Sequence, residues 1–326
     1  MSDTYFTRLR EFAAEIRPFC IELDAKSAVC IEWYAEFVSR ELHVGGSAIR
    51  PFAGDDFCEA LATLSEASGA FAFLALQQFV ANMMTLGKLG KSKSHPAMGV
   101  SFGYLRNPDG PAPKRSKGTV TGLIPWFTGS EIFTKTVFGY RDEEMQEILA
   151  LIPVAYNYSF HPYKEMALIA CSGTQTVRVQ VRGIKIPESA ILSVKPRGSM
   201  REGDAASVIS QTPLLVGNIR SCIQLISMSD GLSQSAKIAA QSRTDFLLDC
   251  VREAFLNGVE PEEGRRIRAE IGDYAVRLAR LAMMTEGAAS LGVNYIAQLR
   301  YKEAIVFNLM AQTDEIVEDA FRSVFF

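Results

Sequence analysis

Apolar residues recur every three or four positions at both ends of the chain, up to about residue 90 and again after residue 195. This spacing is typical of amphipathic or buried α-helices, because one helical turn takes 3.6 residues. Residues 57–64 and 70–86 predict one or two buried helices, and residues 232–250 and 267–281 predict two long amphipathic helices. Both ends of the chain are therefore expected to be helical.

The middle of the chain has a different pattern. Val177, Val179 and Val181 alternate with polar residues, which is the period of a strand with one buried face. Further strands are expected at residues 118–120, 133–140 and 166–170. The order predicts an α+β protein with an N-terminal helical domain (1–96), a middle β domain of barrel or sandwich type (97–195) and a C-terminal antiparallel four-helix bundle (196–326).

Composition and charge exclude several classes of protein. The chain is 48% hydrophobic and 22% charged, with 34 basic and 37 acidic residues, as in an ordinary globular protein. A net charge of −3 argues against nucleic acid as a partner. No run approaches the roughly 18 apolar residues needed to span a membrane, and the N-terminus lacks the pattern of a signal peptide. We therefore expect a cytoplasmic protein without a membrane partner.

Cysteine and histidine usage argues against a metal site. The six cysteines contain no Cys-x-x-Cys pair, and the three histidines lie far apart in the sequence. Structural zinc sites need closely spaced ligand pairs, and disulfide scaffolds are typical of much shorter chains. Reduced thiols without a metal are the expected state.

Three stretches carry motifs. Residues 118–129 read Gly-Thr-Val-Thr-Gly-Leu-Ile-Pro-Trp-Phe-Thr-Gly, and residues 183–192 read Gly-Ile-Lys-Ile-Pro-Glu-Ser-Ala-Ile-Leu. Near the C-terminus, Lys302-Glu-Ala is followed by Gln312-Thr-Asp-Glu-Ile. In this order and at these spacings, they resemble motifs of the acyl-CoA dehydrogenase family. The resemblance implies an acyl-CoA dehydrogenase-like fold and a flavin-dependent oxidoreductase that binds FAD between the β domain and the bundle.

The resemblance also implies which residues contact the flavin. Trp126 and Thr128 match the family's pair beside the isoalloxazine ring, where an indole packs on a flat ring and a hydroxyl or backbone N–H reaches its N5 edge. The family's other flavin strand falls on Ser101 and Gly103, which can contact the cofactor through their backbone. Tyr104, also expected at the cofactor, stands where threonine is usual, and the family's Gly-Ser-Asp sequence is missing.

Additional cofactor and assembly residues follow from the same resemblance. Thr313 and Glu315 lie in the C-terminal motif near the flavin, and Arg243 matches an arginine that reaches the FAD pyrophosphate of a neighbouring subunit. A surface arginine is the alternative interpretation of Arg243. The family also implies a homodimer or homotetramer and a small-molecule substrate such as an acyl thioester.

The position of the catalytic base is the main departure from the family. Removing the α proton of a thioester needs a carboxylate, but the glutamate position of the family aligns with Ala311. The position that supplies this glutamate in a minority of members falls at Gln211 and Thr212. Three hypotheses stay open: a flavin oxidoreductase such as a monooxygenase or oxidase, a dehydrogenase with a relocated base, and a catalytically silent scaffold.

Overall fold

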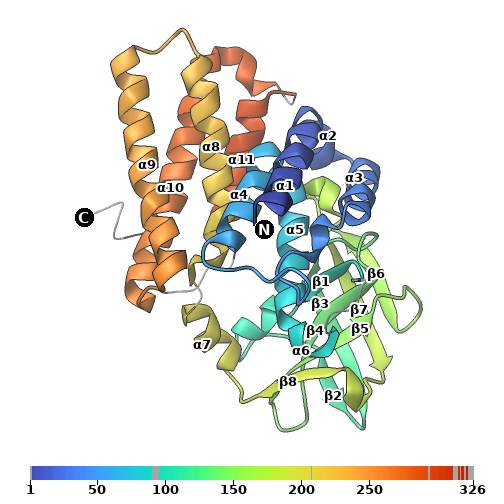
Figure 1. The fold of residues 1–326 in the computed structure, drawn as a ribbon. Helices are drawn as coiled ribbons and strands as arrows, with labels where there is room; N and C mark the ends of the chain where they lie inside the picture. The colour runs from blue at the N-terminus through green and yellow to red at the C-terminus, as the bar shows by residue number, and fades with distance from the viewer. Residues whose placement is uncertain are drawn as a thin grey trace.

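The N-terminal part of the protein is helical in the computed structural model (Figure 1), which describes residues 2–89, 95–206, 208–292 and 294–310, and residues 315, 317, 318 and 321. The helices are α1 (Ser2–Ile16), α2 (Cys20–Ala25), α3 (Ser27–Ser39), α4 (Asp56–Ala67), α5 (Gly69–Met84) and α6 (Leu86–Leu89). The helices predicted at residues 57–64 and 70–86 correspond to α4 and to α5 with α6.

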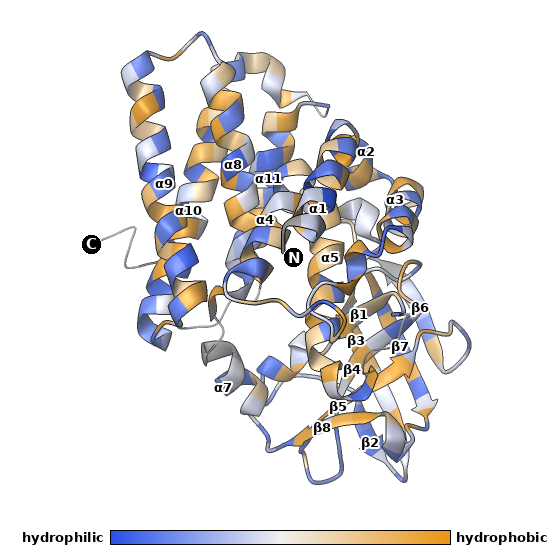
Figure 2. Ribbon diagram, viewed as in Figure 1, coloured by the Kyte–Doolittle hydropathy of each residue, from blue (hydrophilic) through white to orange (hydrophobic). Residues whose placement is uncertain are grey.

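Helix α5 lies at the centre of this part of the molecule. Its sequence is apolar around most of its circumference, so the helix is stable only when it is covered on all sides. Figure 2 shows this apolar character, and most of its side chains are buried. The Ser68 hydroxyl caps the helix by accepting a hydrogen bond from the Phe71 N–H at 3.3 Å. Helix α5 consequently contributes both to the core and to the wall of a pocket described below.

The strands form one mixed sheet in the order β6-β7-β3-β2-β4-β5-β8, with β1 paired to β4. Their bounds are β1 (Met98–Ser101), β2 (Lys114–Ser116), β3 (Thr119–Phe127), β4 (Lys135–Arg141), β5 (Glu147–Pro153), β6 (Phe160–Glu165), β7 (Val177–Ile184) and β8 (Ile191–Lys195). Side chains of β3, β6 and β7 pack with those of β4 and β5, so the sheet curls around a core of its own. The alternation predicted for Val177, Val179 and Val181 is confirmed, because all three are buried in this core.

The strand predicted at residues 166–170 is wrong. Strand β6 ends at Glu165, and the Met166 N–H makes a further bond of 3.0 Å to the Thr176 carbonyl before the chain leaves the sheet. Ala167, Leu168 and Ile169 then line a pocket. The run is apolar because it faces a pocket and the helices beyond it, and periodicity alone does not separate this case from a buried strand.

After the sheet the chain is helical again, with α7 (Ser199–Ala206), α8 (Thr212–Met228), α9 (Gln234–Asn257), α10 (Pro261–Glu286) and α11 (Ile296–Leu309). The segments predicted at residues 232–250 and 267–281 correspond to α9 and α10. Figure 1 shows α8 to α11 side by side, with α9 on the outside. Helix α8 lies very close to α4: a Cβ atom added at Gly217 would come within 2.3 Å of the Ala62 carbonyl oxygen. No described helix is both long and apolar enough to cross a membrane.

A buried ion pair joins α11 to the junction of α4 and α5. Arg300 and Glu303 are 1% and 0% exposed, and Nη1 of Arg300 lies 2.6 Å from Oε2 of Glu303. Oε1 of Glu303 accepts a hydrogen bond from the Gly69 N–H at the start of α5. The Arg300 guanidinium also donates to the last carbonyls of α4, those of Ser65, Glu66 and Ala67. Glu303, which belongs to the third sequence motif, therefore has a structural role in this molecule.

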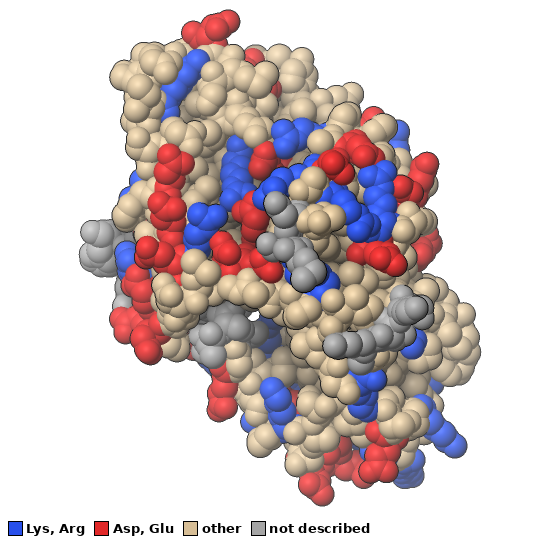
Figure 3. Space-filling model, viewed as in Figure 1, with Lys and Arg blue, Asp and Glu red and all other residues tan. Residues whose placement is uncertain are grey.

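Charged side chains of both signs are mixed over the face of the molecule in Figure 3. Ion pairs such as Arg40 with Glu15 and Arg220 with Glu59 bring opposite charges together on the helical part of the molecule. Such partly exposed pairs each contribute little to stability.

Candidate functional site

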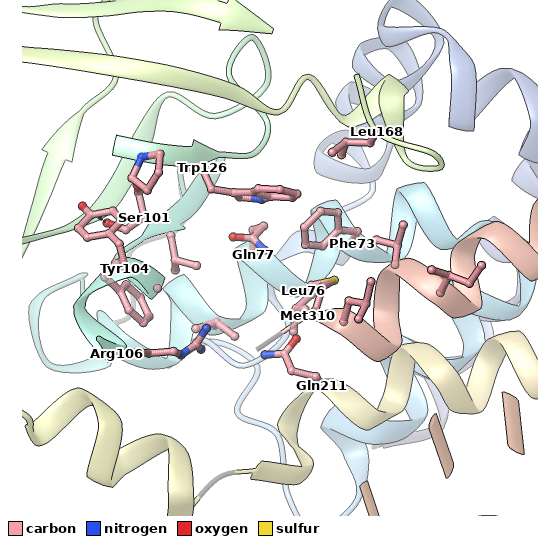
Figure 4. Close-up of a pocket in the computed structure, with 18 of the residues that line it drawn as sticks. Phe73, Leu76, Gln77, Ser101, Tyr104, Arg106, Trp126, Leu168, Gln211 and Met310 are labelled. Atoms are coloured by element: carbon pink, nitrogen blue, oxygen red, sulfur yellow. Dashed lines mark hydrogen bonds between the residues drawn. The ribbon is translucent and has the colours of Figure 1, made fainter. Parts of the chain in front are cut away.

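A pocket of about 650 Å³ lies between the sheet and the helices (Figure 4). Strands β1 and β3 and the segment 167–169 form one side, and helices α5 and α11 with the start of α8 form the other. Its volume is within the range of small-molecule and cofactor sites. Parts of the chain far apart in sequence thus meet around one cavity.

Trp126 forms the sheet side of this pocket. It lies at the end of β3, and 39% of its surface is exposed, whereas most large side chains near it are buried. Figure 4 shows the indole on this side of the pocket, opposite Gln211 and Met310. The indole Nε1–H donates a hydrogen bond of 3.1 Å to the Thr128 hydroxyl, which is buried behind it. The Trp126 ring is therefore available to a ligand, while Thr128 contacts the ring from within the protein.

Ser101, Gly103 and Tyr104 line the same side of the pocket. The Ser101 side chain is 3% exposed, and its buried Oγ has no hydrogen-bond partner in the described structure. A buried hydroxyl without a partner is unfavourable, so a ligand atom that bonds to it would stabilise the site. The structure thus brings together four of the residues that the resemblance assigned to the cofactor.

The Tyr104 hydroxyl is directed toward backbone rather than into the pocket. It lies 2.8 Å from the Ser101 carbonyl oxygen and 2.7 Å from the Gly139 carbonyl oxygen. Burial raises the pKa of the Tyr104 phenol, so the side chain stays neutral. Tyr104 consequently offers the pocket its ring and not a charge.

Neither Arg243 nor Glu315 is among the described residues that line this pocket. Arg243 lies on α9, where it pairs with Glu270 of α10 and stacks over the Phe246 ring. Glu315 pairs with Arg201 at 3.0 Å. A contact of Arg243 with a cofactor on a neighbouring subunit, and of Glu315 with a flavin, both stay predictions.

Two other candidate positions, Ala311 and Thr313, lie outside the described residues. Met310 is the last described residue before them and lines the pocket at the end of α11. Arg268 of α10 fixes this end of the helix, because its guanidinium donates to the carbonyls of Phe307 and Met310 at 2.7 and 3.1 Å. Met310 is therefore held at the pocket wall.

No aspartate or glutamate is among the described residues that line the pocket, and the charged residue there is Arg106. Gln211, which stands at the family's second base position, does line it. The Gln211 side-chain carbonyl is buried and has no hydrogen-bond partner in the described structure. The pocket thus has the Gln211 amide at the position where, according to the resemblance, a minority of the family has the catalytic glutamate.

Three solved structures show what this arrangement resembles, although no family model and no curated protein sequence matches the chain. Butyryl-CoA dehydrogenase from Megasphaera elsdenii is 12% identical, with a TM-score of 0.75 and coverage of 100% of this chain and 98% of that chain. Glutaryl-CoA dehydrogenase from Mycobacterium smegmatis, in complex with FADH2, is 13% identical, with a TM-score of 0.70 and coverage of 97% and 94%. The chain has the acyl-CoA dehydrogenase fold.

The third structure shows that the acyl-CoA dehydrogenase fold also occurs in proteins with other ligands. KijD3, in complex with FMN and dTDP-3-amino-2,3,6-trideoxy-4-keto-3-methyl-D-glucose, is 13% identical, with a TM-score of 0.77 and coverage of 99% of this chain and 93% of that chain. The fold prediction made from the three sequence motifs is confirmed. At these identities the likeness establishes the fold and leaves the reaction open.

The pocket fits the flat ring system of a flavin, which two of these structures hold. The partly exposed Trp126 indole supplies a planar apolar surface, and the unpartnered Ser101 hydroxyl supplies a polar contact at the same side. Aromatic faces pack well on flat rings, and an unpaired buried hydroxyl favours a polar ligand atom. The described residues around the pocket contribute one cation, Arg106, for a phosphate.

Several residues that line the pocket were not predicted as site residues from the sequence. Phe73 and Gln77 lie on α5 among residues that were expected to be ordinary core, and Arg106 lies in the turn after β1. Leu168 and Ile169 belong to the apolar run that was interpreted as a strand.

A carboxyl group behind the pocket wall makes stability depend on pH. Asp24 of α2 accepts a hydrogen bond from the Cys171 N–H, and burial raises the pKa of its carboxyl to about 6. Because the folded state binds this proton more tightly than the unfolded chain does, the contribution of Asp24 favours folding below about pH 4 and declines as the pH rises to about 6. Glu303 acts in the same direction, whereas Lys302 and Arg300 oppose it.

We therefore expect Asp24→Asn to increase the free energy of unfolding above pH 7 by about 1–2 kcal/mol, with little effect near pH 4. The asparagine oxygen can still accept the Cys171 bond without the cost of a buried charge. Urea unfolding at a series of pH values measures the difference. Equal differences at pH 4 and pH 8 would show that Asp24 does not titrate in this range.

Proposed function

We propose that this protein is a flavin-dependent oxidoreductase, with FAD as its cofactor, that acts on a small and mostly apolar molecule by a reaction other than thioester α,β-dehydrogenation. The observation that carries the proposal is the apolar pocket beside the exposed indole of Trp126, in which the described lining residues include no carboxylate. An apolar wall excludes water and binds apolar substrates by burying their surface.

The residues of the two sides of the pocket have different roles in this proposal. Trp126 and Ser101 hold the flavin on the side of the sheet, where the ring supplies hydride exchange when it is bound. Phe73, Leu309 and Met310 bind the apolar part of the substrate on the side of the helices. The unpartnered carbonyl of Gln211 accepts a hydrogen bond from a substrate N–H or O–H and so orients it.

The absence of a base at both family positions supports the choice of reaction. Neither Ala311 nor Gln211 can take a proton from the carbon next to a thioester, because an alkyl group and a neutral amide are not bases at neutral pH. Flavin monooxygenases and oxidases need no thioester base. The ligand of KijD3 is likewise a nucleotide sugar and not an acyl-CoA.

The test is an absorption spectrum of the purified protein, before and after addition of FAD or FMN, followed by mixing with acyl-CoA thioesters of several chain lengths. We expect visible flavin bands and no bleaching by any thioester. Gln211→Glu is the matched variant, since it changes one group in the pocket wall from amide to carboxylate. Bleaching of that variant alone would support the proposed reason for the missing reaction.

The other outcomes contradict the proposal in separate ways. Wild-type protein that is bleached by a thioester has a base that the sequence did not reveal, and it is then a dehydrogenase. Colourless protein that takes up neither FAD nor FMN is a scaffold that keeps the fold without its cofactor.

We further propose that the protein assembles as a homodimer or homotetramer through its outer helices. Helix α9 leaves Ile238 and Phe246 more than half exposed and buries few of its own residues. Exposed apolar side chains on one helix are typical of a surface that another subunit covers.

A further inference from the structure

We infer that Thr128, Thr176 and Thr174 are positioning residues that hold the Trp126 indole in place through a chain of hydrogen bonds with one fixed direction. The Trp126 Nε1 lies 3.1 Å from the Thr128 hydroxyl oxygen. The hydroxyl oxygens of Thr128 and Thr176 are 3.1 Å apart, as are those of Thr176 and Thr174. The three hydroxyl groups are buried, so water does not compete for these bonds.

The groups at the two ends of this chain of hydrogen bonds, the Cys171 carbonyl and the Trp126 N–H, determine the direction in which its bonds are donated. The Thr174 hydroxyl lies 2.7 Å from the Cys171 carbonyl oxygen, which can only accept, so its single proton is used there. Thr174 must then accept from Thr176, and Thr176 must accept from Thr128. At the other end, the indole N–H of Trp126 can only donate, and the Thr128 hydroxyl oxygen accepts this bond with one of its two lone pairs.

This direction turns the Thr128 proton away from the pocket. Thr128 therefore acts on a ligand through Trp126, whose ring it orients. Its hydroxyl proton could be donated to the N5 edge of a flavin only if the hydrogen bond to Thr176 were broken. The ring of Trp126 is partly exposed, and a side chain in that position has room to rotate when its N–H loses its acceptor.

The segment at which this chain of hydrogen bonds ends, residues 171–175, has an unusual backbone conformation. Cys171 and Gln175 flank the short helix η4 (Ser172–Thr174) with φ values of 62° and 53°, in the left-handed region that non-glycine residues rarely adopt. Such backbone persists only where the surroundings fix it, and it is concentrated at functional sites.

Contacts on both sides fix this segment. The N–H groups of Gly129 and Ser130 bond to the carbonyls of Thr174 and Gln175 at 2.8 and 3.2 Å. On the other side Gly173 packs so closely on α2 that an added Cβ would lie 2.2 Å from the Leu23 carbonyl oxygen. The chain of hydroxyls thus connects Trp126 to a rigid point next to the helical part of the molecule.

The test uses tryptophan fluorescence, because the protein has two tryptophans and Trp33→Phe leaves Trp126 as the sole emitter. In that parent, excited at the red edge where tyrosine does not absorb, Thr128→Val removes the acceptor for the indole while keeping the size of the side chain. We expect a red-shifted emission and roughly twofold stronger acrylamide quenching, since the freed ring turns toward water. Thr176→Val removes the next link, and a smaller change in the same direction is expected.

The conservative variant is the decisive control. Thr128→Ser keeps the hydroxyl and should restore the parent spectrum, whereas an effect of side-chain packing alone would leave the serine variant as altered as the valine variant. A Thr128→Val spectrum equal to that of the parent would overturn the inference. Circular dichroism verifies that each variant is folded, and Thr176→Val provides the same test at a second position should Thr128→Val not fold.

A second measurement connects this inference with the proposed function, on which its functional meaning rests. We expect Thr128→Val to bind FAD roughly tenfold more weakly, the change that loss of one hydrogen bond produces, with Thr128→Ser close to the parent. If the parent binds no flavin but the fluorescence series is as expected, the positioning role of the threonines stands and the proposed function fails. Undiminished flavin binding by Thr128→Val would overturn the functional role, and the fluorescence series alone would then decide whether the threonines position Trp126.

Discussion

Replacing Glu303 with alanine is expected to lower the free energy of unfolding by about 3–5 kcal/mol. The substitution removes the partner of the Arg300 guanidinium, which is 1% exposed and cannot reach water without opening the helices around it. It also removes the acceptor of the Gly69 N–H at the start of α5. An unpaired buried charge and an unpaired buried donor both oppose folding.

The matched control is Glu263→Ala on α10. Glu263 pairs with Arg266 at 2.6 Å, the same separation as in the buried pair, but its side chain is 46% exposed. Water replaces the lost partner at such a site, so the expected loss is below about 1 kcal/mol. Urea unfolding followed by circular dichroism compares the two variants. Losses of similar size would mean that burial of the Arg300–Glu303 pair contributes nothing.

The fold could be predicted where the sequence pattern has a single physical explanation. The alternation at Val177, Val179 and Val181 matches a strand with one face in the core, and that strand is β7. The long amphipathic patterns after residue 230 match α9 and α10. The run at residues 166–170 has two explanations, because a pocket wall and a buried strand both favour apolar side chains.

The candidate site could be predicted where its residues belong to one local motif. Trp126 lies in one of the three stretches that carry the resemblance, and Ser101 and Gly103 lie where the resemblance places the family's other flavin strand. Gln77 and Phe73 reach the same pocket from α5, and only the packing of that helix against the sheet brings them there. The partnership of Thr128 with Thr176, 48 residues apart, left no signal because isolated threonines are common in strands and turns.

The predicted division into three domains and the assignment of Arg243, Thr313 and Glu315 to a cofactor stay predictions. Each of these predictions depends on parts of the assembly or of the chain that the described residues do not include. Arg243 requires a neighbouring subunit, and Thr313 requires the segment after Met310. For Ala311, the sequence alone carries the inference that a base is missing.

Replacing Trp126 with alanine is expected to weaken flavin binding about 100-fold, which corresponds to roughly 3 kcal/mol. The indole provides the flat apolar surface on the sheet side of the pocket, and its removal leaves the ring of the cofactor facing a hollow. Trp126→Phe keeps a smaller aromatic surface but loses the N–H that bonds to Thr128, so we expect about a tenfold effect. Titration of the flavin with each protein, followed by quenching of the flavin fluorescence, gives the dissociation constants.

Trp33→Phe is the control for these two variants, because Trp33 packs against Phe12 and Phe19 in the N-terminal helices and does not line the pocket. It should bind flavin like the wild type. A Trp126→Ala variant with unchanged affinity would mean that the flavin, if bound, lies elsewhere, and the pocket would then belong to the substrate alone. The graded series of tryptophan, phenylalanine and alanine separates stacking on the ring from the hydrogen bond behind it, since alanine lacks both and phenylalanine lacks only the second.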